Sequence, residues 1–230
     1  MSKLAVMVGS SIISPVFKDF KRKNVKTKYG MAELLAKSDK IILPRHGISK
    51  MKPPHGINYR ANISALKMLG VKDILAIFSV GSLKKSIKPG SLVIVDDYIS
   101  LFDLKTYYDL DAVFTIPELS QTLRKKIISL AKRLKIKTIN KGIYIQAKGP
   151  RFETRAEIKL IKKYADVVGM TMGSEATLAK ELGMNYAAIC SVDNYANGLI
   201  EKKLDMIKIK KLRKKNLGNV IKLTEGYLHL

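Results

Sequence analysis

The pattern of apolar and polar residues alternates between two periods along most of the chain. Short runs of mainly apolar residues predict strands, because strands that are buried on both faces of a sheet are apolar throughout. These runs lie at 4–8, 40–44, 73–78, 91–97, 141–147, 166–170 and 186–192. Apolar residues at the spacing of an amphipathic helix occupy 58–70, 119–135, 154–164 and 173–183, and a last helix is predicted over 205–228.

This alternation of strands and helices predicts one α/β domain over 1–230, with a central mixed, mostly parallel β-sheet flanked by helices. Its 230 residues are 47% apolar, which is enough for a sizeable core. Gly70 and Gly183 follow two predicted helices at positions typical of C-caps. The stretch 98–118 fits neither period, and long aperiodic loops are often functional.

The formal net charge of +24, from 43 basic and 19 acidic residues, has two interpretations. It is typical of a nucleic-acid-binding protein, and it is also typical of a lysine-rich solvated surface. The lysines recur on the polar faces of predicted helices, which favours the second interpretation, and a small anionic ligand fits either. Cys190 is the only cysteine, which excludes a disulfide scaffold and favours the cytosol. No apolar run is long enough for a membrane span.

Polar residues follow several predicted strands at the point where each strand ends. Open α/β sheets bind ligands at the carboxyl ends of their strands. An arginine there offers a fork of donors suited to phosphate oxygens. The polar groups are Ser10 after the first strand, Arg45 and His46 after the second, Thr171 beside Met170 after a later one, and Asp193 and Asn194 after the last.

The segment GPRFETRAE (149–157) places an aromatic ring and a carboxylate side by side before a helix. A flat apolar ring in Phe152 and one carboxylate in Glu153 suit a small planar molecule that carries an N–H group.

Several blocks of sequence resemble a known family. They are GPRFETRAE (149–157), VVGMTMGSEATLAKELG (167–183) and YAAICSVDN (186–194), preceded in order by PRHG (44–47), NYRANISALKMLGV (58–71) and VGSLKKSIKPGSLVIVDDYI (80–99). Over roughly 4–200 the chain resembles the trimeric-type purine nucleoside phosphorylases, which include the methylthioadenosine and methylthioinosine phosphorylases.

The resemblance implies that orthophosphate displaces a purine from C1′ of a nucleoside, giving free base and a ribose 1-phosphate. The transition state of such a reaction resembles an oxocarbenium ion, so catalysis is a matter of positioning and electrostatics. The resemblance implies orthophosphate as a co-substrate, no other cofactor, no metal, and a homo-oligomer that is a trimer or a hexamer.

The resemblance also implies roles for particular residues. Phosphate is expected at Ser10, Arg45, His46, Ser79 and Thr171, with a bidentate contact from Arg45. Glu153 and Asn194 are expected to act on the base edge as catalytic residues. Substrate contacts are expected from Phe152 on the purine, Met170 on the ribose, and Tyr59, Asn194 and Ala196.

The base edge departs from one branch of the family. Enzymes for 6-aminopurines usually read TDYD here, whereas this chain has Asp193-Asn194-Tyr195-Ala196. An amide at Asn194 can both donate and accept, which suits a purine with a carbonyl at C6. Behind it, Ala196 replaces a second acidic residue.

We therefore expect a 6-oxopurine nucleoside phosphorylase, with 5′-methylthioinosine as preferred substrate and inosine and guanosine as further ones. Leu204, Met206 and Ile209 offer an apolar pocket for the 5′ end of the sugar. The alternative within the family is a methylthioadenosine phosphorylase. The alternative of another class is a nucleic-acid-binding protein on a degenerate phosphorylase fold.

Overall fold

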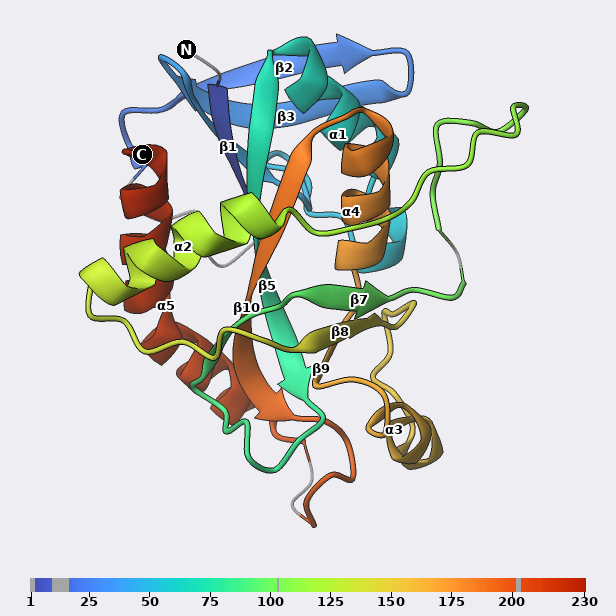
Figure 1. Ribbon diagram of the computed structural model, residues 1–230, viewed down its shortest axis with the longest axis vertical. Coiled ribbons are helices and arrows are strands. Elements are labelled where there is room, and N and C mark those ends of the chain that lie inside the picture. The colour runs from blue at the N-terminus through green and yellow to red at the C-terminus, as the bar shows by residue number, and fades with distance from the viewer. Residues whose placement is uncertain (1–2, 10–16, 103, 202–203) are drawn as a thin grey trace.

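The computed structural model describes residues 3–9, 17–102, 104–201 and 204–230 (Figure 1). In these ranges ten strands form one sheet. The strands are β1 (Lys3–Val8), β2 (Lys21–Thr27), β3 (Gly30–Lys37), β4 (Lys40–Pro44), β5 (Val71–Ser82), β6 (Leu92–Ile94), β7 (Asp97–Ile99), β8 (Ile143–Gln146), β9 (Val167–Gly169) and β10 (Asn185–Tyr195).

The long strand β5 is the centre of the sheet. The strand order is β2-β3-β4-β1-β5-β9-β8-β7, and β10 pairs with both β5 and β6. Neighbours β1–β4, β1–β5, β5–β10, β7–β8 and β8–β9 are parallel, and β2–β3, β3–β4, β5–β9 and β6–β10 are antiparallel. The sheet is therefore mixed, as predicted, and the carboxyl ends of β1, β4, β5 and β10 point the same way.

Helices cover both faces of this sheet. They are α1 (Tyr59–Met68), α2 (Gln121–Arg133), α3 (Arg155–Ile161), α4 (Met172–Glu181) and α5 (Met206–Leu228). Alternate residues of β1 enter different cores: Ala5 and Met7 pack with α1 and α4, whereas Val6 and Val8 pack with α2 and α5. Figure 1 shows these two helix pairs on opposite sides of the central strands.

Each predicted strand and helix is present, with shifts at the ends. The apolar run 91–97 is divided between β6 and β7, and β5 is longer than the run 73–78. Gly70 and Gly183 have φ values of +80° and +66°, the left-handed conformation that favours glycine after a helix. The predicted helix 154–164 is shorter, because α3 ends at Ile161.

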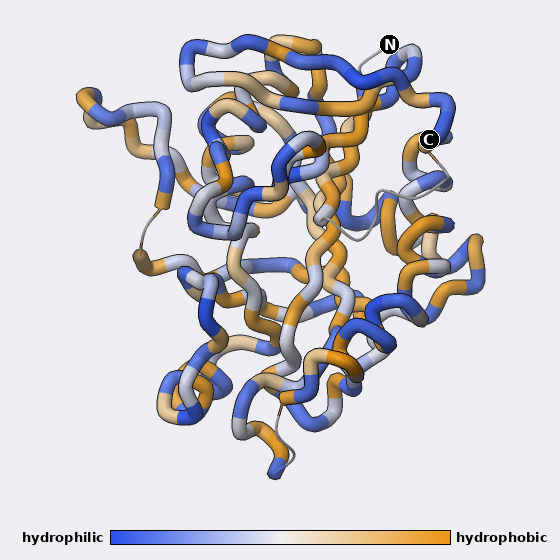
Figure 2. Tube along the Cα trace, turned by 180° about the vertical axis from the view of Figure 1, so that it is seen from behind, coloured by the Kyte–Doolittle hydropathy of each residue, from blue (hydrophilic) through white to orange (hydrophobic). Residues whose placement is uncertain are grey.

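The apolar pattern did not predict the hairpin β2–β3. The first four residues of β2, Lys-Arg-Lys-Asn, are exposed at the edge of the sheet. Charged residues on an edge strand discourage pairing with other chains, and they also remove the alternation that reveals a strand. Figure 2 shows this upper edge as mostly hydrophilic, in contrast to the central strands.

The aperiodic stretch 98–118 has one short strand, β7, and then runs as an irregular segment that projects from the body (Figure 1). Its first part is anchored: the Tyr107 hydroxyl donates to the carbonyl of Arg60 at 2.8 Å, and its backbone N–H donates to Glu181 at 2.7 Å. Its tip is exposed, with Phe114 94% exposed. Among the described residues, no helix is long and apolar enough to cross a membrane.

Candidate active site

A cavity of about 350 Å³ lies where β1, β4, β5 and β10 end. Nine of the predicted site residues line it: Arg45, His46, Ser79, Phe152, Glu153, Met170, Thr171, Asn194 and Ala196. Ser10 lies outside the described residues, but its neighbour Gly9 lines the same cavity. The parallel strands thus bring into one cavity the residues that the sequence assigned to phosphate and to the purine.

Tyr59 is the predicted substrate residue that the structure places elsewhere. Its side chain is 6% exposed on α1, and its hydroxyl donates to the carbonyl of Pro54 at 3.0 Å. It lines a neighbouring cavity of about 670 Å³, which borders the first at Glu153 and Met170. The first turn of α1 thus faces the adjoining hollow, and a direct contact from Tyr59 to the substrate stays a prediction.

Arg45 is buried beneath the cavity and is held by protein groups. Its Nε donates to Glu175 Oε1 at 2.6 Å, and its Nη2 to Glu175 Oε2 at 3.3 Å. Nη1 donates to the carbonyl of Ile77 at 2.7 Å, and Nη2 also approaches the carbonyl of Met7 at 3.4 Å. The guanidinium lies over the ring of Phe78, 4.2 Å from its centre. The bidentate contact expected for phosphate is therefore made to Glu175, and one N–H of Nη1 is left without a partner in the described residues.

His46 has a defined tautomer. Its Nδ1 lies 2.7 Å from the carbonyl oxygen of Lys52, which can only accept, so Nδ1 carries the proton. Burial lowers the pKa of His46, and the charges of Arg45 and Arg213 lower it further, against the hydrogen bond to Lys52. The neutral ring presents Nε2 as an acceptor. A neutral His46 suits the hydroxyl of a monohydrogen phosphate, which can donate to Nε2.

The loop that carries His46 is held by the edge hairpin. Glu33 on β3 accepts from the backbone N–H of Ile48 at 2.7 Å and of Ser49 at 2.9 Å. The Ser49 hydroxyl hydrogen bond, the two backbone bonds and Arg22 lower the pKa of Glu33 to about 2, against the effect of burial. Gly47 has a φ of +89°, which suits glycine at this sharp turn.

Thr171 lies between β9 and α4 with its hydroxyl available to a ligand. It is the N-cap residue of α4, yet its side chain makes no capping hydrogen bond. The buried hydroxyl of Tyr144 accepts instead from the backbone N–H of Thr171 at 3.1 Å and of Met172 at 3.4 Å. The helix terminus is thus satisfied without Thr171 Oγ, which remains beside the cavity.

The base end of the cavity contains the Phe152–Glu153 pair. The Phe152 ring is 42% exposed, and Glu153 is 8% exposed. Burial raises the pKa of Glu153, against a hydrogen bond from its own backbone N–H. Its backbone carbonyl accepts from Asn197 Nδ2 at 3.0 Å, which fixes the loop. The result is a buried carboxylate that can accept a hydrogen bond from a planar ligand.

Asn194 stands on the other side of this end, near the end of β10. Its Nδ2 donates to the carbonyl of Tyr195 at 2.8 Å. A Cβ at Gly81 would meet this Nδ2 at 3.3 Å, so glycine leaves room for the amide. Ala196 lines the cavity near this amide. This edge therefore carries an amide and a methyl group, whereas the pattern expected for 6-aminopurine enzymes has two carboxylates.

Helix α5 adds three residues to the cavity, at the i, i+3 and i+7 spacing of one helix face: Met206, Ile209 and Arg213. The first two were predicted as part of an apolar pocket; Leu204 does not line the cavity. Arg213 was missed, although its spacing from Ile209 could have indicated it. Its Nε donates to Asp193 Oδ2 at 3.0 Å.

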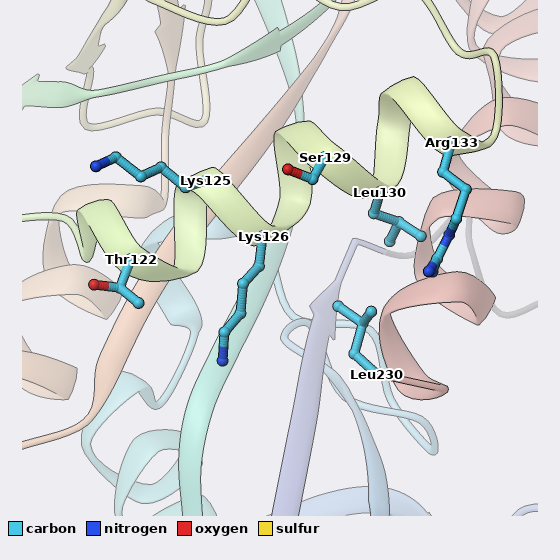
Figure 3. A pocket seen from close by; sticks show the side chains of 7 residues that line it. All are labelled: Thr122, Lys125, Lys126, Ser129, Leu130, Arg133 and Leu230. Carbon is cyan, nitrogen blue, oxygen red and sulfur yellow. The ribbon is translucent and has the colours of Figure 1, made fainter.

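A third hollow, beside α2, shares no lining residue with these two cavities (Figure 3). It is lined by Thr122, Lys125, Lys126, Ser129, Leu130, Arg133 and Leu230. None of the predicted site residues is among them.

Comparison with known proteins agrees with this geometry. The family profile described as phosphorylase superfamily matches residues 3–229. A protein of Archaeoglobus fulgidus named probable 6-oxopurine nucleoside phosphorylase is 41% identical over 228 residues, covering 96% of this chain and 94% of its own length. A probable S-methyl-5′-thioinosine phosphorylase of Methanocaldococcus jannaschii is 36% identical, covering 97% and 91%.

Related enzymes that are named for another substrate are almost as similar. The S-methyl-5′-thioadenosine phosphorylase of Pyrococcus furiosus is 37% identical, covering 97% of this chain and 90% of its own. Among solved structures, a mutant adenosine/methylthioadenosine phosphorylase of Schistosoma mansoni, in complex with methylthioadenosine, is 25% identical with a TM-score of 0.88, covering 100% and 91%. Overall identity therefore does not separate the substrates.

Proposed function

The chain belongs to the phosphorylase superfamily, and from this premise we propose that it catalyses the phosphorolysis of 6-oxopurine nucleosides to free purine and (5-methylthio)ribose 1-phosphate. The enzyme is a purine nucleoside phosphorylase, a pentosyltransferase of purine salvage. One observation carries the proposal: the carboxylate of Glu153 and the phosphate residues line one cavity.

The two ends of the cavity suit the two halves of the reaction. An oxygen of orthophosphate forms a bond to C1′ while the bond from C1′ to N9 breaks, and the electron pair of that bond goes to the purine. In this proposal Thr171, His46, the one open N–H of Arg45 and the backbone near Ser79 orient the phosphate. The sugar lies between them, against Met170, and the departing base lies on Phe152. Holding both partners in this order accounts for catalysis without a covalent intermediate.

The base edge supports a 6-oxopurine. Hypoxanthine and guanine carry an N1–H donor, which Glu153 accepts, and Asn194 can serve O6 or N7. Adenine presents an N1 acceptor, so two acceptors would oppose each other in a partly dry site at a cost of about 1–3 kcal/mol. We propose this mismatch as the main source of selectivity.

The sugar end supports a methylthio substituent. Met206 and Ile209 are the two apolar residues of α5 that line the cavity. A buried 5′-hydroxyl without a partner costs free energy, whereas a methylthio group does not. We therefore propose S-methyl-5′-thioinosine as the preferred nucleoside, ahead of inosine and guanosine.

A substrate panel with added phosphate, followed by chromatography of the released base, tests this function. We expect efficient release of hypoxanthine from methylthioinosine and slower release of adenine from methylthioadenosine. A preference for methylthioadenosine would change the proposed substrate but not the proposed reaction. No phosphate-dependent release from any purine nucleoside would remove the proposal.

The assembly is also proposed. The segment 98–118 exposes Leu101 and Phe102 just after β7 and Leu110 and Phe114 further along, where it projects from the body. Several large apolar side chains exposed on one segment are typical of contact surfaces. We propose a cytosolic homo-oligomer, a trimer or a hexamer, that uses orthophosphate as co-substrate and no other cofactor. Light scattering that gives the 25.7 kDa mass of one chain would contradict the oligomer.

A further inference from the structure

The predicted phosphate residues offer little uncompensated positive charge. Arg45 forms a buried ion pair with Glu175, and protein acceptors take four of its five N–H groups. His46 has a lowered pKa and presents an acceptor in its neutral form. Ser79 and Thr171 are neutral. A phosphate dianion at this end would therefore meet mainly neutral groups.

Among the described residues that line this end, Arg213 is the second arginine, and although it is paired with Asp193 it keeps more open N–H groups than Arg45 does. Its side chain is 37% exposed and lines the cavity, whereas the Arg45 side chain is 2% exposed. Its Nη2 donates to Ser79 Oγ at 3.0 Å. Since the backbone near Ser79 is expected at the phosphate, the guanidinium lies beside a segment that is assigned to the phosphate.

A buried carboxylate holds Arg213 in place. Asp193 is 0% exposed and accepts from Arg213 Nε at 3.0 Å, from Ser191 Oγ at 3.0 Å and from the Ser79 hydroxyl. Asn216, one turn further along α5, donates to Ser191 Oγ at 3.0 Å. The network joins α5 to the ends of β5 and β10. It uses two of the five N–H groups of Arg213, and the other three have no partner in the described part of the chain.

We propose that Arg213, positioned by Asp193, is an additional phosphate-binding residue. The inference rests on the proposed phosphorolysis for the identity of the anion. The Nη1 edge of the guanidinium contacts the phosphate while Nε stays on Asp193. Arg213 supplies the open, charged donor edge that the Arg45–Glu175 pair cannot. Because Met206 and Ile209 lie on the same helix face, the contact also seats the apolar 5′ residues over the sugar.

Binding of inorganic phosphate alone, measured by isothermal titration calorimetry, tests the proposal apart from turnover. Charge-assisted hydrogen bonds contribute enough that Arg213→Gln should raise the phosphate Kd about 10- to 100-fold. The phosphate KM should rise in parallel, with the nucleoside KM changing less than about threefold. Lys214→Gln is the matched control: it removes the same charge from the next, exposed position of α5 and should leave the phosphate Kd within about twofold.

Arg213→Lys keeps the charge, and it is the variant to measure if Arg213→Gln does not fold. A lysine cannot contact Asp193, Ser79 and an anion together, so we expect about a 3- to 10-fold weaker phosphate affinity. A folded Arg213 variant whose phosphate affinity matches Lys214→Gln would overturn the inference and leave the phosphorylase function intact. A wild-type protein that binds no phosphate and cleaves no nucleoside would overturn both.

Discussion

The two ends of the cavity are built differently. At the phosphate end, side chains are held by other protein groups: Arg45 by Glu175 and two carbonyls, and His46 by the carbonyl of Lys52. At the base end, the Phe152 ring is 42% exposed, and the Glu153 carboxylate receives only its own backbone N–H among the hydrogen bonds described. The side chains of the phosphate end are thus hydrogen-bonded to the core, whereas those of the base end make few hydrogen bonds to other residues.

This difference predicts how mutations will act. Residues that share a hydrogen-bonded network are coupled, so a change at the phosphate end should alter folding and binding together. A change at the base end should alter substrate choice with little effect on stability, because few protein contacts are lost. Four substitutions examine this contrast, from the largest expected effect to the smallest.

Arg45→Ala should have the largest effect. It leaves Glu175, which is 0% exposed, without its cation, and breaking a buried pair in this way costs about 3–5 kcal/mol. We therefore expect a lower free energy of unfolding in urea together with loss of phosphate-dependent turnover. From the sequence alone Arg45 looked like a residue at a strand end; its burial makes it a structural residue as well.

The double variant Arg45→Met with Glu175→Gln separates the two roles of Arg45. It removes both charges and keeps a hydrogen-bonding group for the Tyr186 hydroxyl, which donates to Glu175 at 2.8 Å. Stability should largely return, while phosphate binding should not. If the single variant unfolds at the same urea concentration as the wild type, the phosphate end is not coupled to the core.

The contrast also marks what the sequence could and could not predict. Strand periodicity predicted β1, β4, β5 and β10, and the resemblance to a known family, which includes motifs that follow β8 and β9, named nine residues that line the cavity. The sequence could not predict which other residues hold these side chains in place. Glu33 comes from an exposed edge hairpin whose charges hide its alternation, and Arg213 comes from a helix whose docking depends on tertiary packing.

Glu153→Gln tests the base end. An amide cannot replace the charged acceptor opposite N1–H without a reoriented contact, so kcat/KM for inosine should fall about 10- to 100-fold. The free energy of unfolding should change little or rise, because the buried carboxylate has a raised pKa and its charge is costly there. A large loss of stability would show that this end is part of the core.

The raised pKa of Glu153 also predicts how activity depends on pH. Protonation replaces an acceptor by a donor facing N1–H, so kcat/KM for inosine should decline as pH falls through a pKa above the ordinary glutamate range. The limb should be absent in Glu153→Gln. In Glu157→Gln the decline should remain but move to lower pH, because the charge of Glu157 helps to raise the pKa of Glu153.

Asn194→Asp should change selectivity more than stability. An ionised aspartate can only accept, so it loses the donor to O6 and gains an acceptor for an exocyclic amine. We expect about a tenfold lower ratio of methylthioinosine to methylthioadenosine cleavage, measured as kcat/KM for each. Asn185→Asp, at the exposed start of the same strand, should leave this ratio unchanged. Full methylthioinosine selectivity in Asn194→Asp would remove Asn194 from the base edge.

Glu33→Gln should have the smallest effect, and it acts at a distance from the ligand. Glu33 holds the loop of His46 through two backbone N–H groups, and a glutamine oxygen can keep part of that contact. We expect a phosphate KM raised about threefold, with the nucleoside KM unchanged.

Because the folded pKa of Glu33 is lowered to about 2, the stability that Glu33 contributes is present above the unfolded carboxyl pKa and is lost as pH falls towards 2. The difference in unfolding free energy between wild type and Glu33→Gln should therefore be constant above about pH 5 and shrink below it. Asp19→Asn removes a carboxylate from an exposed pair with Lys37 in the same region and should show neither effect. An equal phosphate KM in both variants would mean that the loop keeps its shape without the hairpin, and that the coupling of the phosphate end stops at Arg45.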